Sequence, residues 1–182
     1  MLKLPIAIFL LFAMVLNSAS ADVIRSTITI HAGVNAFQPG DTVPIALRIE
    51  VLEEWYTYAE DPGDAGMPPN IRFHAPEGVE IGEWQFPPHE TFTDSVGTYY
   101  GYKEEVVLLN EITMPSDVPD DVHFQGVFNV VWMICKDACL PFQDRVTLTL
   151  PRASEEEAIT EVDGWSALLQ AGGWDVEEEI AD

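Results

Sequence analysis

The sequence predicts an all-β protein built as an antiparallel β-sandwich, and three observations support this prediction. Apolar and polar residues alternate along several short segments, as they do in strands with one buried face. Turn-forming pairs such as Pro39-Gly40 separate these segments. Between them, no stretch has the apolar spacing of an amphipathic helix. Short strands divided by turns are typical of two packed antiparallel sheets.

The expected strands follow one another at residues 24–30, 43–51, 71–75, 102–109, 124–135 and 145–150. In the first of them, Ile28 and Ile30 share one face. Pro44 lacks the N–H group that the interior of a sheet needs, so it favours an edge position for the start of the second strand. The segments 60–70 and 86–101 contain Pro and Gly without any period, and we expect them to be loops. Long loops in compact domains are often functional.

The first residues have the pattern of a secretory signal peptide. One lysine precedes an apolar run at residues 4–16, and an Ala-Ser-Ala sequence follows, which predicts a signal peptide at residues 1–21 that is removed before Asp22. The apolar run is shorter than the roughly 20 residues that cross a bilayer. We therefore expect the domain at residues 22–152 to be exported and soluble, without spanning the membrane after cleavage. Its compartment would be oxidising.

The last segment, residues 153–182, holds ten acidic side chains and no Lys or Arg. Ser154 and Glu157 have the spacing of a capping box, which predicts a helix beginning at Ser154. Gly164, Gly172 and Gly173 interrupt the pattern, so short helical turns are expected, with Trp165, Leu168, Leu169 and Trp174 docked on the sandwich. The alternative is a partly ordered acidic tail that aids solubility.

The charge balance excludes one class of partner. The chain carries 31 acidic and 8 basic side chains, for a formal net charge of −23. Nucleic acids are bound by clustered Lys and Arg, which this chain lacks, so no nucleic-acid partner is expected.

Cys135 and Cys139 are the sharpest feature of the sequence. In a straight strand, Cα atoms four residues apart lie roughly 13 Å from each other, too far for a disulfide, so a bond requires a turn between them. Alternating residues precede and follow the pair at 128–134 and 146–150. The pair is therefore expected at the tip of a β-hairpin, with Cys135 on the face opposite Ile134.

A bridge across so small a loop adds little to stability, because the entropy removed from the unfolded chain grows with loop length. A tight, accessible dithiol is instead suited to thiol-disulfide exchange. Lys136 would favour the thiolate, whereas Asp137 would oppose it. Local chemistry alone leaves both a redox pair and a structural bridge open.

Several ordered motifs, taken together, resemble one family. They are WYTY (55–58), DPGDAGMP (61–68), APEG (75–78), WQFPP (84–88), YGY (100–102) and VWMICKDACLP (131–141). Across residues 24–151 the chain resembles the DsbD N-terminal-domain family, and within it the DsbD-like and ScsB-like thiol:disulfide interchange proteins. The segment W-x-x-C-K-x-x-C-x-P is the specific part of the resemblance.

The resemblance implies an immunoglobulin-like periplasmic domain that acts as a protein-disulfide reductase or electron-relay component. Such a domain accepts electrons from a membrane-embedded or thioredoxin-like thiol donor and passes them to oxidised periplasmic proteins. By correspondence with the motif, Cys139 forms the mixed disulfides and Cys135 resolves them. Members of the family commonly continue into a transmembrane and a thioredoxin-like domain. These 182 residues hold neither, so we expect a stand-alone exported chain whose electron source is a separate protein.

The resemblance also implies aromatic residues around the cysteines. Tyr56 and Tyr58 correspond to a tyrosine pair that flanks the active-site hairpin. The stretch 90–102, which ends at Tyr102, corresponds to a cap loop that shields the cysteines. The cap residue itself is not placed by the motif, and the candidates are Phe92, Tyr99 and Tyr100. We expect at least one of these three rings to contact Cys135 or Cys139.

The alternative to electron relay is a copper-handling or protein-binding module, in which the cysteine pair is structural or binds metal. Met67, Met114 and Met133 supply further soft sulfur atoms that would suit Cu(I) if they converged on the two cysteines. The four histidines are scattered without zinc-binding spacing. Apart from this Cu(I) alternative, no cofactor is expected beyond the redox-active disulfide.

Overall fold

The computed structural model describes residues 26–95, 97–119, 123–154 and 156–176. These residues form ten strands and one helix. The elements are β1 (Thr27–Ala32), β2 (Thr42–Glu50), β3 (Tyr56–Gly63), β4 (Asn70–His74), β5 (Glu80–Ile81), β6 (Glu90–Thr93), β7 (Thr98–Lys103), β8 (Glu105–Thr113), β9 (His123–Cys135), β10 (Cys139–Pro151) and α1 (Trp165–Ala171). The all-β prediction is confirmed. The expected signal peptide lies outside the described residues.

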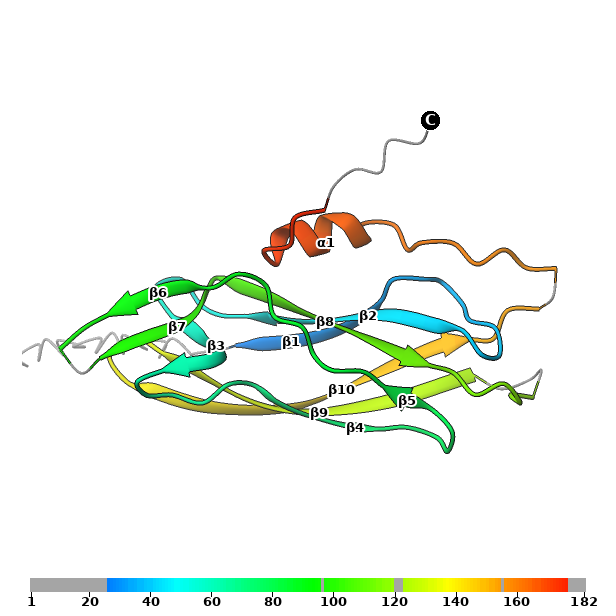
Figure 1. Cartoon of the computed structure of the whole chain (residues 1–182), viewed down its shortest axis with the longest axis horizontal. Helices are drawn as coiled ribbons and strands as arrows, with labels where there is room; N and C mark the ends of the chain where they lie inside the picture. The colour runs from blue at the N-terminus through cyan, green and yellow to red at the C-terminus, as the bar shows by residue number, and fades with distance from the viewer. Residues whose placement is uncertain (1–25, 96, 120–122, 155, 177–182) are drawn as a thin grey trace, which may run out of the picture.

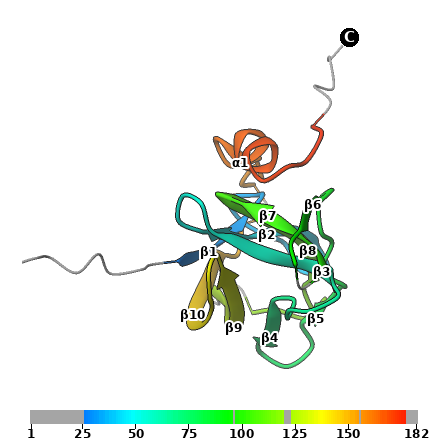
Figure 2. The same ribbon diagram turned by 90° about the vertical axis from the view of Figure 1, so that its left-hand side faces the viewer.

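The strands form two sheets. One has the order β1-β2-β8-β5, and the other has the order β10-β9-β3-β7-β6, with β4 also paired to β9. All of these pairings are antiparallel. The long β9–β10 pair lies across the core from β1, β2 and β8 (Figures 1 and 2). The helix α1 lies over the outer face of the sheet formed by β1, β2 and β8. The predicted antiparallel sandwich is thus confirmed.

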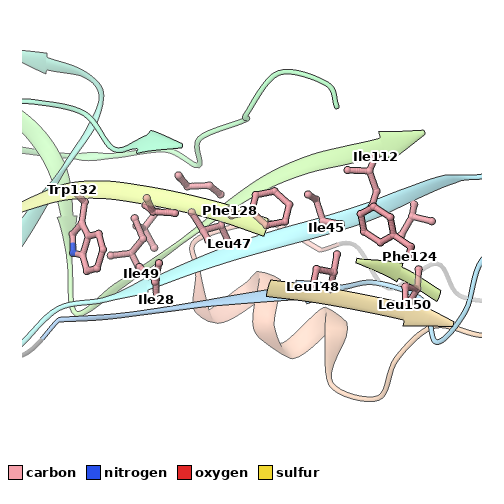
Figure 3. Packing of buried hydrophobic residues seen from close by; sticks show 14 of the residues in the cluster. Ile28, Ile45, Leu47, Ile49, Ile112, Phe124, Phe128, Trp132, Leu148 and Leu150 are labelled. Atoms are coloured by element: carbon pink, nitrogen blue, oxygen red, sulfur yellow. The ribbon is translucent and has the colours of Figure 1, made fainter. Parts of the chain in front are cut away.

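The core lies between the two layers and is filled by alternate residues of each strand. Phe128 and Trp132 on β9 are 0% and 1% exposed, and they pack in one cluster with Leu47 and Ile49 of β2 (Figure 3). The alternation continues along β9 to Ile134, which also belongs to this cluster. Because successive side chains of a strand point to opposite faces, the core fixes the direction of the next residue, which is the first cysteine.

The expected single strand at 102–109 is wrong, because the chain changes sheets within it. Tyr102 pairs with Thr57 in the sheet of β9, whereas Val106 pairs with Ile49 in the sheet of β2. Glu104 stands between them with a φ of 60°, a left-handed conformation that breaks strand geometry. Apolar residues stand on both sides of Glu104, at Tyr102 and at residues 106–109, so the sequence alone does not reveal the crossing.

Both expected loops are partly wrong. The first residues of the segment 60–70 extend β3 as far as Gly63, past a register shift against β7. The segment 86–101 contains the hairpin of β6 and β7. Gly101, at the end of this segment, is required by close packing, because a Cβ atom there would lie 2.0 Å from the carbonyl oxygen of Thr57. Only glycine allows β7 to come this close to β3.

The helix expected to begin at Ser154 is also wrong. One turn does form there, since the Glu157 N–H donates to the Ser154 carbonyl at 3.1 Å. The chain then extends, because Thr160 accepts the Asn35 N–H at 3.1 Å and donates its own N–H to the Asn35 side chain at 2.9 Å. Hydrogen bonds between Thr160 and Asn35, which follows β1, therefore take the place of the backbone hydrogen bonds that a helix would make here. The helix α1 starts only after Gly164.

Pro44 does not mark an edge, because β2 lies between β1 and β8. Gly33 donates its N–H to the Pro44 carbonyl at 2.8 Å, but proline has no N–H to return. The Gly33 carbonyl instead accepts the N–H of Val162, at 2.9 Å. The C-terminal segment thus supplies the donor that a proline in a central strand removes.

The C-terminal segment packs closely on the outer face of β8. The Trp174 indole N–H donates to the Val107 carbonyl at 2.7 Å. Gly172 lies so close to Val107 that an added Cβ would be 2.2 Å from its Cβ and Cγ2 atoms. Val107 is fully buried, although its side chain faces away from the main core. The helix α1 and residues 172–174 therefore form a third layer over this sheet (Figure 2).

We predict that Gly172→Ala destabilises the fold by about 1 to 3 kcal/mol, because the new methyl group overpacks a buried contact. Urea unfolding followed by tryptophan fluorescence measures this change. Ala167→Ser, on the exposed face of α1, is the matched control, with an expected change within about 0.5 kcal/mol. Equal stability of the two variants would show that the contact between Gly172 and Val107 is not tightly packed.

Candidate functional site

The two cysteines close the end of the longest hairpin. Cys135 is the last residue of β9 and Cys139 the first of β10, and the two are paired in register. Their Cα atoms lie 4.1 Å apart and their sulfur atoms form a disulfide. Inside the turn, the Lys136 N–H donates to the Ala138 carbonyl at 3.2 Å. This agrees with the hairpin-tip position expected from the flanking alternation.

The two cysteines differ sharply in exposure. Cys135 is 0% exposed and belongs to a small cluster with Tyr58 and Tyr99, which are 2% and 6% exposed. This cluster lies on the face of β9 opposite Ile134, as the alternation requires. Cys139 is exposed. The side chain of Cys139 is therefore accessible at the surface, whereas that of Cys135 is enclosed.

Tyr58 contacts both sulfur atoms. Its hydroxyl lies 3.2 Å from the Cys135 Sγ and 3.6 Å from the Cys139 Sγ. A disulfide sulfur carries no proton, so the hydroxyl is the donor. Burial, followed by the hydrogen bond with Tyr56, raises the pKa of Tyr58 well above its usual value. The hydroxyl therefore keeps its proton throughout the range in which thiols titrate and remains able to donate to a thiolate.

We predict that Tyr58→Phe slows alkylation of the reduced protein at pH 7 by about tenfold. A hydrogen bond to a charged group contributes about 1.5 kcal/mol or more, and 1.4 kcal/mol corresponds to a tenfold change. The bond favours the thiolate, so without it the same thiolate fraction is reached only at a higher pH. The pH–rate profile of alkylation should therefore shift to higher pH. Rates measured with iodoacetamide from pH 5 to 10 test this, and an unchanged profile would contradict it. Tyr102→Phe, whose hydroxyl donates to Pro87 instead, is the control.

The β6–β7 hairpin, which we call the cap hairpin (residues 90–103), places aromatic rings beside this cluster. Phe92 stacks on Tyr56 with ring centroids 4.8 Å apart, and Tyr56 meets the Tyr58 ring edge-on at 5.5 Å. Tyr99 packs in the same cluster as Cys135 and donates its hydroxyl to Asp94 at 3.2 Å. Two of the three cap candidates, Phe92 and Tyr99, thus lie at the cysteine end of the molecule, where the cap hairpin and the β9–β10 turn come together (Figure 1).

Two other aromatic candidates lie elsewhere. Tyr100 points away from the cysteine cluster, packs against the main core and lies 4.8 Å from the ring of His89. Tyr102 is buried in the main core, and its hydroxyl donates to the Pro87 carbonyl at 2.8 Å. Burial raises the pKa of Tyr102 to about 12.

An open cleft of about 400 Å³, which we call the dithiol cleft, is lined by Cys139 of the disulfide, while Cys135 lies buried beside it. Its lining includes Tyr58, Gly66, Met67, Asp94, Met133 and Cys139. Gly66 faces the Tyr58 ring so closely that a Cβ atom would lie 2.3 Å from it. The loop after β3 is therefore held against the tyrosine that contacts the sulfurs. Sequence reasoning did not assign Gly66 or Asp94 to the site, although Gly66 stands within the motif DPGDAGMP.

Lys136 and Asp137 both line the dithiol cleft and are exposed. Lys136 forms an ion pair with Glu54 at 2.6 Å. The hydrogen bond from this pair raises the pKa of Lys136 and lowers the pKa of Glu54. Glu54 was not expected from the sequence, because its contact with Lys136 depends on how the chain enters β3. The Glu54 carboxylate thus partly neutralises the positive charge that Lys136 places beside the cysteines.

Within the described residues, no group of three or more His, Cys, Asp or Glu side chains is arranged to hold a metal ion. In the same part of the chain, no helix is long and apolar enough to cross a membrane.

Comparisons with known proteins identify the family through one match and give similar solved structures. Residues 29–151 match the family "Thiol:disulfide interchange protein DsbD, N-terminal". The crystal structure of the N-terminal periplasmic domain of ScsB from Proteus mirabilis is similar, with a TM-score of 0.55, 19% identity and 81% of this chain covered. That match covers 52% of the ScsB structure, so the chain spans about half its length. The reduced DsbD N-terminal domain of Neisseria meningitidis has a TM-score of 0.38 and 11% identity, and the match covers 73% of this chain and 90% of that one.

A search of curated proteins finds no significant match. The family match nevertheless covers most of the chain and includes the disulfide hairpin with both cysteines. It shows that the chain belongs to the DsbD N-terminal-domain family of thiol:disulfide interchange proteins.

Proposed function

We propose that the protein is an exported, periplasmic thiol-disulfide interchange protein that relays electrons through Cys135 and Cys139. The observation that carries this proposal is the asymmetry of the pair: one sulfur is exposed at the dithiol cleft and the other is fully buried beside it. An exchange protein needs one thiol that partners reach and a second that competes with them from within. Membership of the family supports the same chemistry.

In the reducing half-reaction, the Cys139 thiolate attacks a sulfur of an oxidised protein substrate. A mixed disulfide forms, and the first substrate thiolate leaves and takes up a proton. The Cys135 thiolate then attacks the Cys139 sulfur, which releases the second substrate thiol and leaves the Cys135–Cys139 disulfide. The cysteine pair loses two electrons and is oxidised, and the substrate disulfide gains the same two electrons and is reduced.

The pair is then reduced again by a separate protein dithiol, either membrane-embedded or thioredoxin-like. The donor thiolate attacks the exposed Cys139 sulfur, and Cys135 leaves as the thiolate. Tyr58 is positioned to stabilise that leaving group, because its hydroxyl lies 3.2 Å from the Cys135 sulfur. The second thiolate of the donor then attacks the donor sulfur of this mixed disulfide, which forms the donor disulfide and releases Cys139 as a thiolate, so that two electrons have passed from the donor to the cysteine pair.

The experiment that tests the proposal is reduction of the purified, oxidised chain by a thioredoxin-like donor, followed by thiol alkylation and intact-mass measurement. We expect two alkyl groups per chain after the donor is added and none before it. A donor in which the attacking cysteine is replaced by serine is the control. If two alkyl groups never appear with any active dithiol donor, the cysteine pair is structural and the proposal fails.

A binding module of the same fold makes a different prediction. Its partner would be retained by a chain in which both cysteines are replaced by serine, whereas an exchange protein would lose covalent capture altogether. Comparing the double variant with the wild-type chain in a binding assay against the same purified donor separates the two functions.

A further inference from the structure

Two methionine side chains stand beside the cysteine pair. Met133 lies two residues before Cys135, on the same face of β9, and packs against the cluster of Cys135, Tyr58 and Tyr99. Met67 comes from the loop after β3. Both methionines line the dithiol cleft together with Cys139. Four sulfur-bearing side chains from three segments of the chain are therefore gathered at one end of the sandwich.

The loop that carries Met67 is fixed next to the sulfurs. The preceding residue, Gly66, abuts the Tyr58 ring, so that a Cβ atom there would lie 2.3 Å from it. The hydroxyl of the same ring lies within 3.6 Å of both cysteine sulfurs. Met67 and Met133 are each half-buried, so their thioethers are neither enclosed in the core nor surrounded by water.

The third methionine considered for a sulfur site does not join this group. Met114 is 2% exposed, packs in the main core and lines a separate cavity with Phe37 and Phe124. It provides an internal control, because it is a methionine of the same chain that has no access to the cysteines.

The chemistry of this donor set selects a soft cation. Thiolate and thioether sulfurs favour Cu(I), whereas zinc is normally held by cysteine, histidine and carboxylate ligands in sets of four. The described residues offer no group of three or more His, Cys, Asp or Glu side chains for such a zinc site. The charged side chains that line the dithiol cleft are Asp94, Asp137 and Lys136. Lys136 is paired with Glu54, so the remaining charge at the cleft is negative and favours a bound cation over a bound anion.

We propose that the reduced protein binds one Cu(I) ion at the dithiol cleft, through the thiolates of Cys135 and Cys139 and the thioethers of Met133 and Met67. The two thiols release their protons to solvent on binding, and the copper keeps its oxidation state. The site exists only after a two-electron reductant has opened the disulfide. The proposal does not depend on electron relay, since it needs only the reduced pair and not a particular donor.

The test is an anaerobic Cu(I) titration of the chain reduced with a phosphine, in competition with a chromophoric Cu(I) chelator. We expect one Cu(I) per reduced chain, none for the oxidised chain, and none for Cys139→Ser. Met67→Leu and Met133→Leu should each weaken Cu(I) binding by about tenfold or more, since loss of even an outer-shell partner costs a metal site about that much. Met114→Leu should bind as the wild type does.

Leucine keeps the volume of methionine, so a merely structural role of Met67 or Met133 would leave the affinity for Cu(I) unchanged. Copper affinities of both variants equal to that of Met114→Leu would overturn the proposal, as would Zn(II) binding that matches Cu(I) binding and ignores both methionines. Reduction of the same variants by a dithiol donor is measured in parallel. Normal exchange without copper binding refutes only this site, whereas copper binding without exchange refutes only the proposed function.

Discussion

With Cys135→Ser, we expect a mixed disulfide between Cys139 and an oxidised protein substrate to accumulate until it accounts for most of the reduced chain. The first step, attack by the exposed Cys139, is intact in this variant. The second step is not, because the thiol that releases the substrate is missing. The reaction is measured by intact mass spectrometry after the prereduced variant is mixed with a disulfide-bonded, unfolded protein. In the wild type, the same adduct should be transient.

Cys139→Ser is the matched control and should form no adduct. The remaining thiol, Cys135, is 0% exposed and packs beneath Tyr58 and Tyr99, so a macromolecular disulfide has no path to it. Trapping by Cys139→Ser to the same extent as by Cys135→Ser would reverse the assigned roles. The comparison thus tests the asymmetry of the site rather than the presence of two thiols.

The second large effect concerns the aromatic rings over the cysteines. In chains that carry Cys139→Ser, so that only the buried Cys135 thiol can react, we expect Tyr99→Ala to raise the rate of reaction with a small disulfide, such as oxidised glutathione, by about tenfold or more over the chain that is otherwise wild type. Tyr99 shares the buried cluster with Cys135, so a chain with this ring intact must open locally before a small reagent reaches the Cys135 thiol. Removing an opening cost of about 1.4 kcal/mol accelerates reaction tenfold. Phe92→Ala should raise the reaction rate less, because Phe92 stacks on Tyr56, and Tyr56 in turn contacts Tyr58, the residue next to the sulfurs.

Tyr100→Ala controls for loss of a ring from the same strand, because Tyr100 packs against the main core instead. In the Cys139→Ser chain, its rate should match that of the chain that is otherwise wild type. Thermal unfolding of all three variants shows whether each remains folded at the assay temperature. Unchanged rates for both Tyr99→Ala and Phe92→Ala would show that these rings do not shield Cys135.

The position of the cysteines was predictable because the alternation around them is unusually long. Apolar residues repeat on one face of β9 up to Ile134, so the sequence placed Cys135 on the opposite face and a turn after it. The difference in exposure between the two cysteines was not predictable. It depends on Tyr58 and Tyr99, which come from β3 and β7 and meet Cys135 only through pairing of strands far apart in the chain.

The wrong expectations have a common cause, which is tertiary pairing that overrides local pattern. The capping-box spacing at Ser154 and Glu157 is real, but Thr160 finds hydrogen bonds with Asn35, 125 residues away, and the helix does not form there. Likewise, Pro44 is tolerated inside a sheet because Val162 bonds to the carbonyl that proline leaves without a donor. Neither partner is visible from the local sequence.

The central claim, that Cys135–Cys139 is an exchange site, is tested most directly by the reduction potential of the pair. The purified chain is equilibrated in a series of thiol-disulfide buffers, alkylated, and its reduced fraction determined by mass. We predict a reversible two-electron transition at a potential above about −300 mV, where exchange with dithiol proteins is possible. A pair that stays oxidised at lower potentials would behave as a structural disulfide and would contradict the account.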